Sequence, residues 1–180
     1  MIKPKLVLFD VDGVLTDGRK QYDQSGSVVS KFFADLDFTA IKAFKCLGVN
    51  IAWVSGDSNV NRKVAESRSI PFYFTREHNV ALAKAELLAR IEKDFSVTRE
   101  EMWFVGDDVF DSSMAGNVGL TLCLSNSPSY LKNKFDIVIP LQSGEFVALW
   151  VFEFYLQIFG VKFPSEEQIA AQESGELFRY

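Results

Sequence analysis

Short apolar runs recur along the chain, and several of them end abruptly in polar residues or glycine. The first run, Leu6–Phe9, is followed at once by two carboxylates and a glycine, Asp10, Asp12 and Gly13. An apolar run of this length that stops at a turn signal is typical of a strand buried on both faces of a parallel sheet. The same pattern recurs at residues 50–54, 71–74 and 101–105.

Helical spacing of the apolar residues separates these runs. It is found in segments 37–47, 59–67 and 79–93, and a strongly apolar segment follows at 146–159. Strands that alternate with helices predict an α/β fold, here a doubly wound, Rossmann-like parallel sheet with helices on both faces. Ligands of such sheets bind just outside the carboxyl ends of the strands. The polar residues that follow each run are therefore the candidate site residues.

A β-hairpin is expected at residues 19–33, inserted between the first strand and the first helix. The cluster from Asp23 to Gly26 joins two extended flanks, and Gly26 suits a left-handed turn position. Such a hairpin would project from the sheet, and its exposed edges would need a cover such as another subunit. We assign residues 1–160 to one core domain and residues 161–180 to a polar, acidic C-terminal tail.

Composition limits the classes of function. The 180 residues are 48% hydrophobic and carry a formal net charge of −5, which indicates one globular domain and argues against a nucleic-acid partner. The apolar segment 146–159 contains Glu153 and is too short to cross a membrane. The chain shows no signal peptide, and its two cysteines favour free thiols, so we expect a cytoplasmic protein.

A second group of carboxylates follows the run at 101–105. Asp107, Asp108 and Asp111 stand at the same edge of the predicted sheet as Asp10 and Asp12. Clustered carboxylates repel one another and need a cation, and oxygen ligands of this kind suit Mg²⁺. The alternative is a solvated acidic loop whose aspartates cap short helices. Two such groups at one edge favour the metal site.

Candidate phosphate contacts come from two other segments. Ser55 and Gly56 follow the second strand, where a hydroxyl and free backbone N–H groups suit a phosphate. An ordinary turn with a helix cap is the alternative. Lys84 interrupts the apolar face of segment 79–93, so its ammonium needs an anionic partner, unless it extends past the core edge into water.

Together these residues would make a site for phosphoryl transfer. Asp10 suits the nucleophile that attacks phosphorus, and Asp12 suits the acid that protonates the leaving oxygen and later activates water. A cation would screen the repulsion between Asp10 and the phosphate. Phosphate contacts would come from Ser55, Gly56 and Lys84, and Mg²⁺ contacts from Asp10 and Asp107.

Four parts of the chain resemble the four motifs of the haloacid dehalogenase superfamily of phosphatases. They are Asp10-Val-Asp-Gly-Val, Ser55, Lys84 and Gly106-Asp-Asp. The longer segment from Asp10 to Gly18 is followed by the hairpin, and no cap domain is inserted. This arrangement resembles the branch of 3-deoxy-D-manno-octulosonate 8-phosphate (KDO 8-phosphate) phosphatases. The resemblance implies a phosphorylated sugar substrate and a homotetramer in which hairpins associate and a neighbouring subunit covers the site. It also implies metal ligation by Asp10, Asp107 and the Asp12 backbone carbonyl, with Asp108 and Asp111 in support.

The chain departs from this branch at three places. The branch usually carries Arg-Asp-Gly after the hairpin, Gly-Arg after the second-motif hydroxyl, and a glycine- and arginine-rich segment near the last helix. This chain has Leu36, Asp57 and the segment around Glu145 there. A guanidinium suits a sugar-acid carboxylate because its planar fork binds in a bidentate manner. The departures therefore bear on the substrate, and a neutral sugar phosphate is an alternative.

Three functions are compatible with these residues. The leading hypothesis is a Mg²⁺-dependent phosphomonoesterase acting on a small sugar phosphate. The second is a catalytically weak interaction or oligomerisation module, such as the phosphatase-like part of a CMP-sugar-acid synthetase, although the complete set of motif residues argues against it. The third is a receiver-like signalling domain. In such a domain the phosphorylated aspartate usually ends a middle strand, whereas Asp10 ends the first.

Overall fold

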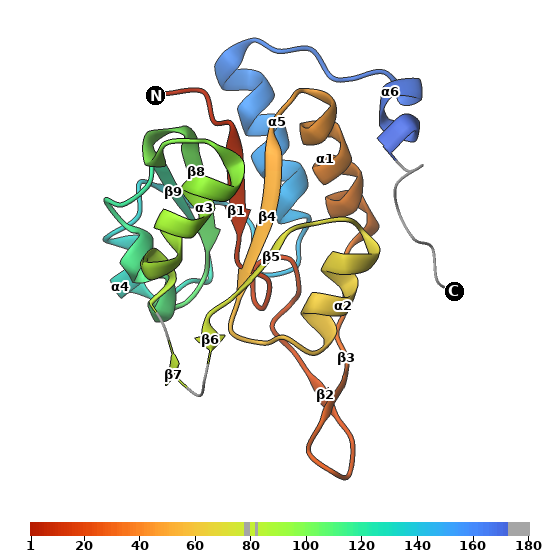
Figure 1. Ribbon diagram of the computed structural model, residues 1–180, viewed down its shortest axis with the longest axis vertical. Helices are drawn as coiled ribbons and strands as arrows, with labels where there is room; N and C mark the ends of the chain where they lie inside the picture. The colour runs from red at the N-terminus through yellow and green to blue at the C-terminus, as the bar shows by residue number, and fades with distance from the viewer. Residues whose placement is uncertain (78–79, 82, 173–180) are drawn as a thin grey trace.

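The computed structural model describes residues 1–77, 80, 81 and 83–172 (Figure 1). A six-stranded sheet forms its centre, and every neighbouring pair in it is parallel. In spatial order its strands are β10 (Ile137–Ile139), β9 (Leu120–Leu124), β8 (Met102–Gly106), β1 (Leu6–Phe9), β4 (Asn50–Ser55) and β5 (Phe72–Phe74).

The strand order reverses direction at β1. The chain adds β4 and β5 on one side of β1, then returns to add β8, β9 and β10 on the other. Phe9 at the end of β1 lies opposite Trp53 of β4 and Val105 of β8. In a doubly wound sheet, the carboxyl ends of the two strands at such a reversal form the ligand-binding position. Here those strands are β1 and β8.

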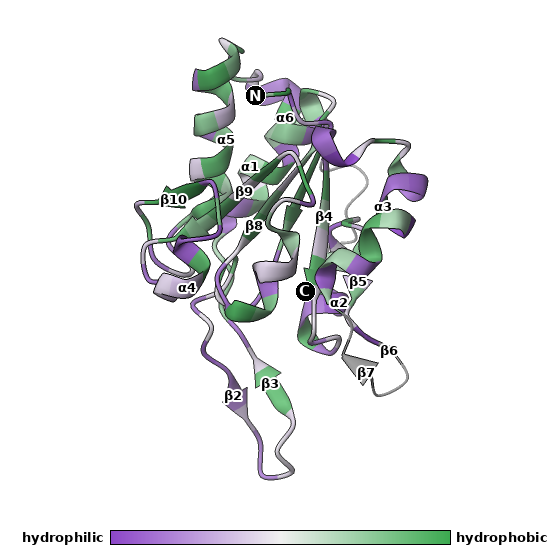
Figure 2. Cartoon of the chain, turned by 90° about the vertical axis from the view of Figure 1, so that its left-hand side faces the viewer, coloured by the Kyte–Doolittle hydropathy of each residue, from purple (hydrophilic) through white to green (hydrophobic). Residues whose placement is uncertain are grey.

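Helices cover both faces of the sheet, as the sequence predicts (Figures 1 and 2). Alternate residues of β1 point to opposite faces, so Val7 and Phe9 join one apolar cluster while Leu6 and Leu8 join the other. The first cluster lies under α1 (Asp35–Cys46), α2 (Val60–Ser67) and α5 (Val147–Phe159). The second lies under α3 (Leu88–Phe95) and α4 (Ser129–Lys132).

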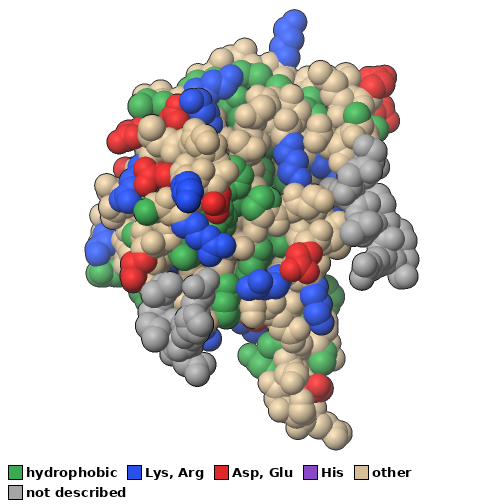
Figure 3. Space-filling view, viewed as in Figure 1, with side chains coloured by type: hydrophobic (Ala, Val, Ile, Leu, Met, Phe, Trp, Pro, Cys, Tyr) green, Lys and Arg blue, Asp and Glu red, His purple; other side chains and the backbone are tan. Residues whose placement is uncertain are grey.

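The expected hairpin is present between β1 and α1. Its strands are β2 (Gln21–Tyr22) and β3 (Val28–Ser30), which pair antiparallel. Gly26 in the turn has a φ of +79°. The hairpin extends well beyond the rest of the molecule (Figures 1 and 3). Exposed apolar side chains on or beside it are Tyr22, Val29 and Phe32.

The prediction of a helix at residues 79–93 is wrong for the first half of that segment. The strands β6 (Arg76–Glu77) and β7 (Val80–Ala81) form a small hairpin there, and a 3₁₀ turn, η1 (Lys84–Leu87), precedes α3. The helical periodicity of this segment did not determine its backbone conformation. Lys84 forms ion pairs with carboxylates at the sheet edge, and these fix where the regular helix begins. Residues 78, 79 and 82 lie outside the described part.

The segment assigned to a C-terminal tail contains a helix, α6 (Glu166–Ala171). The Ser165 side chain accepts a hydrogen bond from the Gln168 backbone N–H and caps this helix. Ile169 packs against the core, and the Cys46 thiol donates to the Gln168 carbonyl. Residues 173–180 lie outside the description. Two further 3₁₀ turns are η2 (Arg99–Glu101) and η3 (Val109–Met114). In the described ranges no helix has the length and apolar character needed to span a membrane.

Candidate active site

Asp10 stands where the chain leaves the sheet. The four residues of β1 before it are fully buried, and its own backbone N–H still donates to the Val105 carbonyl of β8. Asp10 as a whole residue is 8% exposed, and it lies at the reversal point between β1 and β8. Its Oδ1 atom is 2.8 Å from the Nζ atom of Lys84. The sheet thus presents a buried carboxylate with one cationic partner.

The loop after β8 supplies a buried carboxylate, Asp111, and a partly buried one, Asp107. Asp111 is fully buried, and its Oδ2 atom accepts hydrogen bonds from the backbone N–H groups of Asp107 and Asp108 at 2.8 and 3.2 Å. Its other oxygen pairs with Lys84. Asp108 itself is exposed, and its side chain accepts from the Val109 N–H as the cap of η3. Asp111 therefore shapes the loop, while Asp108 begins the 3₁₀ turn.

Three carboxylates converge on one position. One oxygen each from Asp10, Asp107 and Asp111 lie within 4.8 Å of one another. Burial and the charges of Asp10 and Asp111 raise the pKa of Asp107 to about 9. Burial also raises the pKa of Asp10 to about 6, against the opposing pull of Lys84. Burial alone would lower the pKa of Lys84, but Asp10 and Asp111 raise it above its ordinary value.

The donor set fits a divalent cation. Lys84 pairs with two of the three carboxylates, Asp10 and Asp111, and the buried Oδ1 atom of Asp107 has no hydrogen-bond partner within the described chain. A buried carboxylate oxygen left unpaired is costly unless a cation takes it. Gly13 allows the close approach: its φ is +91°, and a Cβ atom there would lie 2.1 Å from Asp107 Oδ2. Oxygen-only ligands of this kind suit Mg²⁺.

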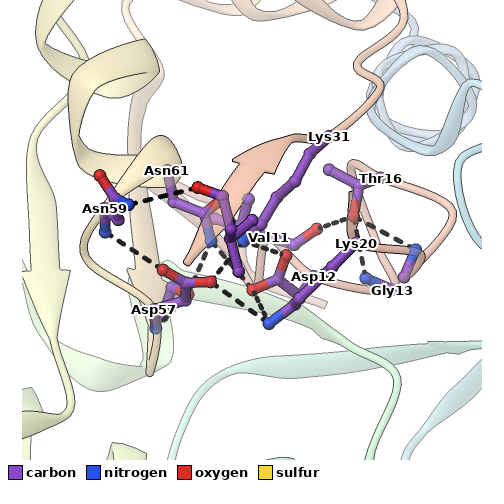
Figure 4. Close-up of polar contacts among 12 residues, drawn as sticks. Val11, Asp12, Gly13, Thr16, Lys20, Lys31, Asp57, Asn59 and Asn61 are labelled. Carbon is purple, nitrogen blue, oxygen red and sulfur yellow. Dashed lines mark hydrogen bonds and ion pairs between the residues drawn. The ribbon is translucent and has the colours of Figure 1, made fainter. Parts of the chain in front are cut away.

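Asp12 points to a different set of partners. Its Oδ1 atom lies 2.6 Å from Lys31 Nζ, and its Oδ2 atom accepts from Asn61 Nδ2 at 3.0 Å (Figure 4). Lys20 Nζ is 3.4 Å from the same Oδ2 atom. The Asp12 side chain is thus held apart from the three-carboxylate cluster. Its expected contribution to a metal through the backbone carbonyl stays a prediction.

Ser55 and Gly56 end β4 beside these groups. The Ser55 Oγ atom is buried and accepts from the Asp57 N–H at 3.1 Å and from Asn61 Nδ2 at 3.0 Å. Neither bond uses the proton of the hydroxyl, which remains able to donate to an anion. A Cβ atom on Gly56 would lie 3.1 Å from Arg76 Nε. Glycine here lets the segment after β5 approach the turn closely.

Comparison with known proteins decides the family. No protein-family model matches the chain. The KDO 8-phosphate phosphatase KdsC of Haemophilus influenzae is 31% identical over 142 residues, which cover 78% of this chain and 76% of that protein. The chain belongs to the KdsC family of haloacid dehalogenase phosphatases.

Solved structures of the KdsC family agree with this assignment. The cobalt-bound phosphatase of H. influenzae aligns with a TM-score of 0.79 and 30% identity, covering 88% of this chain and 90% of that one. The Moraxella catarrhalis phosphatase, solved with magnesium, phosphate and KDO, aligns with a TM-score of 0.76 and 23% identity over 86% of this chain and 86% of that one. The second likeness is one of fold. The chain is thus a phosphatase of the KdsC type with a capless α/β fold.

At two of the three places where the chain departs from the KdsC branch, the residue has a polar partner. Asp57 Oδ2 pairs with Lys31 at 2.7 Å and Lys20 at 3.2 Å. Glu145 accepts from the Gln142 N–H at 2.8 Å. Leu36, at the start of α1, is 47% exposed. The Asp57 carboxylate is therefore paired with the two lysines at the roots of the hairpin.

Sequence reasoning missed the lysines and the asparagine that surround Asp12. Lys20 immediately precedes β2 and Lys31 immediately follows β3, so both stand at the roots of the same insertion. Asn61 shares one face of α2 with Val64 and Ala65, and it is fully buried. A polar residue on an apolar helix face needs a partner. That signal was present in the sequence, whereas the partner's identity was not.

Proposed function

We propose that the protein is a Mg²⁺-dependent phosphomonoesterase. Its substrate is KDO 8-phosphate or a related sugar-acid phosphate, and its reaction passes through an aspartyl-phosphate on Asp10. The observation that carries the proposal is the buried Asp10 carboxylate, bonded to Lys84 and adjacent to the unpartnered oxygen of Asp107. The names of the KdsC relatives and the metal in the Haemophilus structure support it.

The chemistry follows from the two roles that the carboxylates can take. Asp10 attacks phosphorus with one oxygen, and the bond from phosphorus to the sugar oxygen breaks. Lys84 holds Asp10 in place and offsets the charge of the transferred phosphoryl group. The Ser55 hydroxyl and the backbone N–H of Gly56 donate to the phosphoryl oxygens. Bound Mg²⁺, held by Asp10 and Asp107 with Asp111 adjacent, supplies charge screening between nucleophile and phosphate.

Asp12 moves the protons of both half-reactions. In the first it donates a proton to the departing sugar oxygen, because an alkoxide is a poor leaving group. In the second the resulting carboxylate takes a proton from the water that attacks the aspartyl-phosphate, which releases phosphate and restores Asp10. The Asp12 side chain is not a member of the three-carboxylate cluster, which supports this division of roles.

A substrate panel tests the proposal. Purified protein with Mg²⁺ is offered KDO 8-phosphate, phosphates of nine-carbon sugar acids and neutral sugar phosphates, and released phosphate is measured. We expect the sugar-acid phosphates to give the highest kcat/KM, because the KdsC relative is named for a substrate of that class. Preference for a neutral sugar phosphate would revise the substrate class. Undetectable turnover by folded protein across the whole panel would favour the interaction module instead.

We further propose a homotetramer assembled through the hairpin. Tyr22, Val29 and Phe32 are 59%, 51% and 75% exposed there, and exposed apolar side chains on a projecting hairpin are typical of an interface. A neighbouring subunit would then cover the capless site. We also propose a cytoplasmic location, which the free thiols of Cys46 and Cys123 support.

A further inference from the structure

Lys31 carries a fully buried ammonium beside the active site. Its side chain is 0% exposed, and its Nζ atom has three acceptors: Asp12 Oδ1 at 2.6 Å, Asp57 Oδ2 at 2.7 Å and Asn61 Oδ1 at 2.9 Å (Figure 4). An ammonium has three hydrogens, so all its donors are used. A buried lysine with saturated donors is fixed in one place, and it fixes the groups that it bonds.

The partners of Lys31 form one closed network around Asp12. Asn61 accepts from Lys31 with its oxygen, and it donates through Nδ2 to Asp12 and to the Ser55 hydroxyl. The reversed orientation of this amide would set its NH₂ group against the ammonium, so Lys31 fixes Asn61 as well. Asp12 is thus held on both oxygens, and Asn61 links it to the phosphate-binding hydroxyl.

Asp57 supplies the charge that keeps the lysines there. Two carboxylates, Asp12 and Asp57, face two ammoniums, Lys20 and Lys31, within 3.4 Å. Without Lys31, the two carboxylates would face each other with only the partly exposed Lys20 between them, and like charges at close range repel. Asp12 would then lose the orientation that the network gives it.

Both cations come from the roots of the hairpin. Lys20 immediately precedes β2 and Lys31 immediately follows β3, and the Asn59 side chain donates to the Val28 carbonyl of β3 at 3.4 Å. The geometry of Asp12 is therefore set by an insertion that lies outside the sheet, in addition to the strand that carries the residue.

We propose that Lys31 is the positioning residue for Asp12, with Asp57 as the counter-charge that holds Lys31 in place. The inference rests on the proposed function, because it assigns Asp12 the proton transfers. Lys31 keeps the Oδ1 atom of Asp12 occupied, so the Oδ2 atom is presented to the departing sugar oxygen once its contacts with Asn61 and Lys20 yield. Loss of Lys31 impairs proton delivery to the leaving group more than it impairs phosphate binding or nucleophilic attack.

The test compares two leaving groups in Lys31→Met and wild-type protein. The value of kcat/KM reports the steps up to formation of the aspartyl-phosphate. In those steps p-nitrophenolate leaves without being protonated, whereas a sugar alkoxide needs a proton to leave. We expect Lys31→Met to lower kcat/KM about 10-fold or more for the best sugar phosphate of the panel, within the usual range of general acid catalysis. For p-nitrophenyl phosphate we expect little change. Equal losses for both substrates, or no loss for either, would overturn the inference.

Two further variants separate positioning from folding. Asp57→Asn keeps the shape of the partner and removes its charge, so it should reproduce the leaving-group selectivity at smaller amplitude even if Lys31→Met fails to fold. An unchanged Asp57→Asn enzyme would contradict the role given to Asp57. Lys5→Met, which breaks the exposed pair with Glu101 far from the site, serves as the control and should change neither value. If the wild-type protein turned over no phosphate ester, the proposed function would be refuted. If the wild type were active and Lys31→Met lost kcat/KM equally for both substrates, only this inference would be refuted.

Discussion

The Nζ atom of Lys84 lies 2.8 Å from Oδ1 of Asp10 and joins the end of β1 to the turn that precedes α3. The same ammonium pairs with the fully buried Asp111. One cation therefore serves two carboxylates that come from different strand ends. Because all three groups are buried, the arrangement matters both for stability and for the reaction.

Replacement of Lys84 by methionine should remove activity and destabilise the fold. Two buried carboxylates would lose their cation, and breaking a buried ion pair from one side costs about 3–5 kcal/mol in the free energy of unfolding. Urea denaturation in metal-free buffer measures the change. The control is Lys5→Met, whose lysine is 60% exposed and whose loss should cost within about 1 kcal/mol. Equal costs for both variants would show that Lys84 is not a buried partner of Asp10.

A methyl group on Gly13 should displace Asp107. A Cβ atom there would lie 2.1 Å from Asp107 Oδ2, and the φ of +91° already disfavours alanine. Gly26→Ala is the matched control, because its φ is +79° and its Cβ atom would meet no atom within 4 Å. Each alanine carries a backbone penalty of about 1–2 kcal/mol. Only Gly13→Ala should also weaken Mg²⁺ binding in calorimetry, and similar Mg²⁺ affinities for the two variants would contradict the predicted role of Asp107.

Metal-free protein should become less stable as the pH rises. Asp107, with its pKa raised from 3.8 to about 9, and Asp10, raised to about 6, bind protons more tightly when folded. The stability they contribute is present at low pH and is lost as the pH passes through these folded-state values. Mg²⁺ displaces the protons, so its stabilising effect should grow with pH, reaching about 2.7 kcal/mol at 100 times its dissociation constant.

Thermal unfolding at several pH values, with and without Mg²⁺, measures this relationship. Asp107→Asn removes the group that titrates highest, so the variant should lose most of the pH dependence on the alkaline side and most of the response to Mg²⁺. A Mg²⁺ response that is independent of pH in the wild type would contradict the account of this cluster.

A charge at the root of the hairpin should prevent assembly. Phe32 is 75% exposed, and Phe32→Asp would place a carboxylate in the proposed interface. Sedimentation velocity should show a tetramer for wild type and smaller species for the variant. Ile2→Asp, which changes a 55% exposed residue away from the hairpin, should leave the tetramer intact. A wild-type monomer at micromolar concentration would rule out the proposed assembly.

The sequence was most informative about the site residues that directly follow the ends of strands. Apolar runs that stop at Asp10, Ser55 and Gly106 predict a parallel sheet. In a parallel sheet the carboxyl ends of the strands lie at one edge, independently of the loop conformations. The meeting of Asp10 and Asp107 follows from that geometry. Asp111, which was expected to support the metal site, lies in the same cluster, and its Oδ2 atom holds the tight turn after β8.

What could not be predicted depends on tertiary contacts of inserted segments. Nothing in the local pattern joins Lys31 to Asp12 and Asp57, because the path of a hairpin relative to a sheet is set by packing. The segment around Lys84 has helical periodicity, yet ion pairs with distant carboxylates delay the helix to Leu88. In the same way α6 forms where composition alone indicated a polar tail, since Ile169 packs on the core.

Detection of the covalent intermediate tests the central claim most directly. Asp12→Asn protein is mixed with p-nitrophenyl phosphate and Mg²⁺, a substrate whose leaving group needs no proton, and is quenched in acid for peptide mass analysis. The variant lacks the base for the second half-reaction, so phosphate should accumulate on the peptide that carries Asp10 and be absent from the Asp10→Asn, Asp12→Asn double variant. Turnover by the wild type without any label on Asp10, or label that persists in the double variant, would contradict Asp10 as the nucleophile.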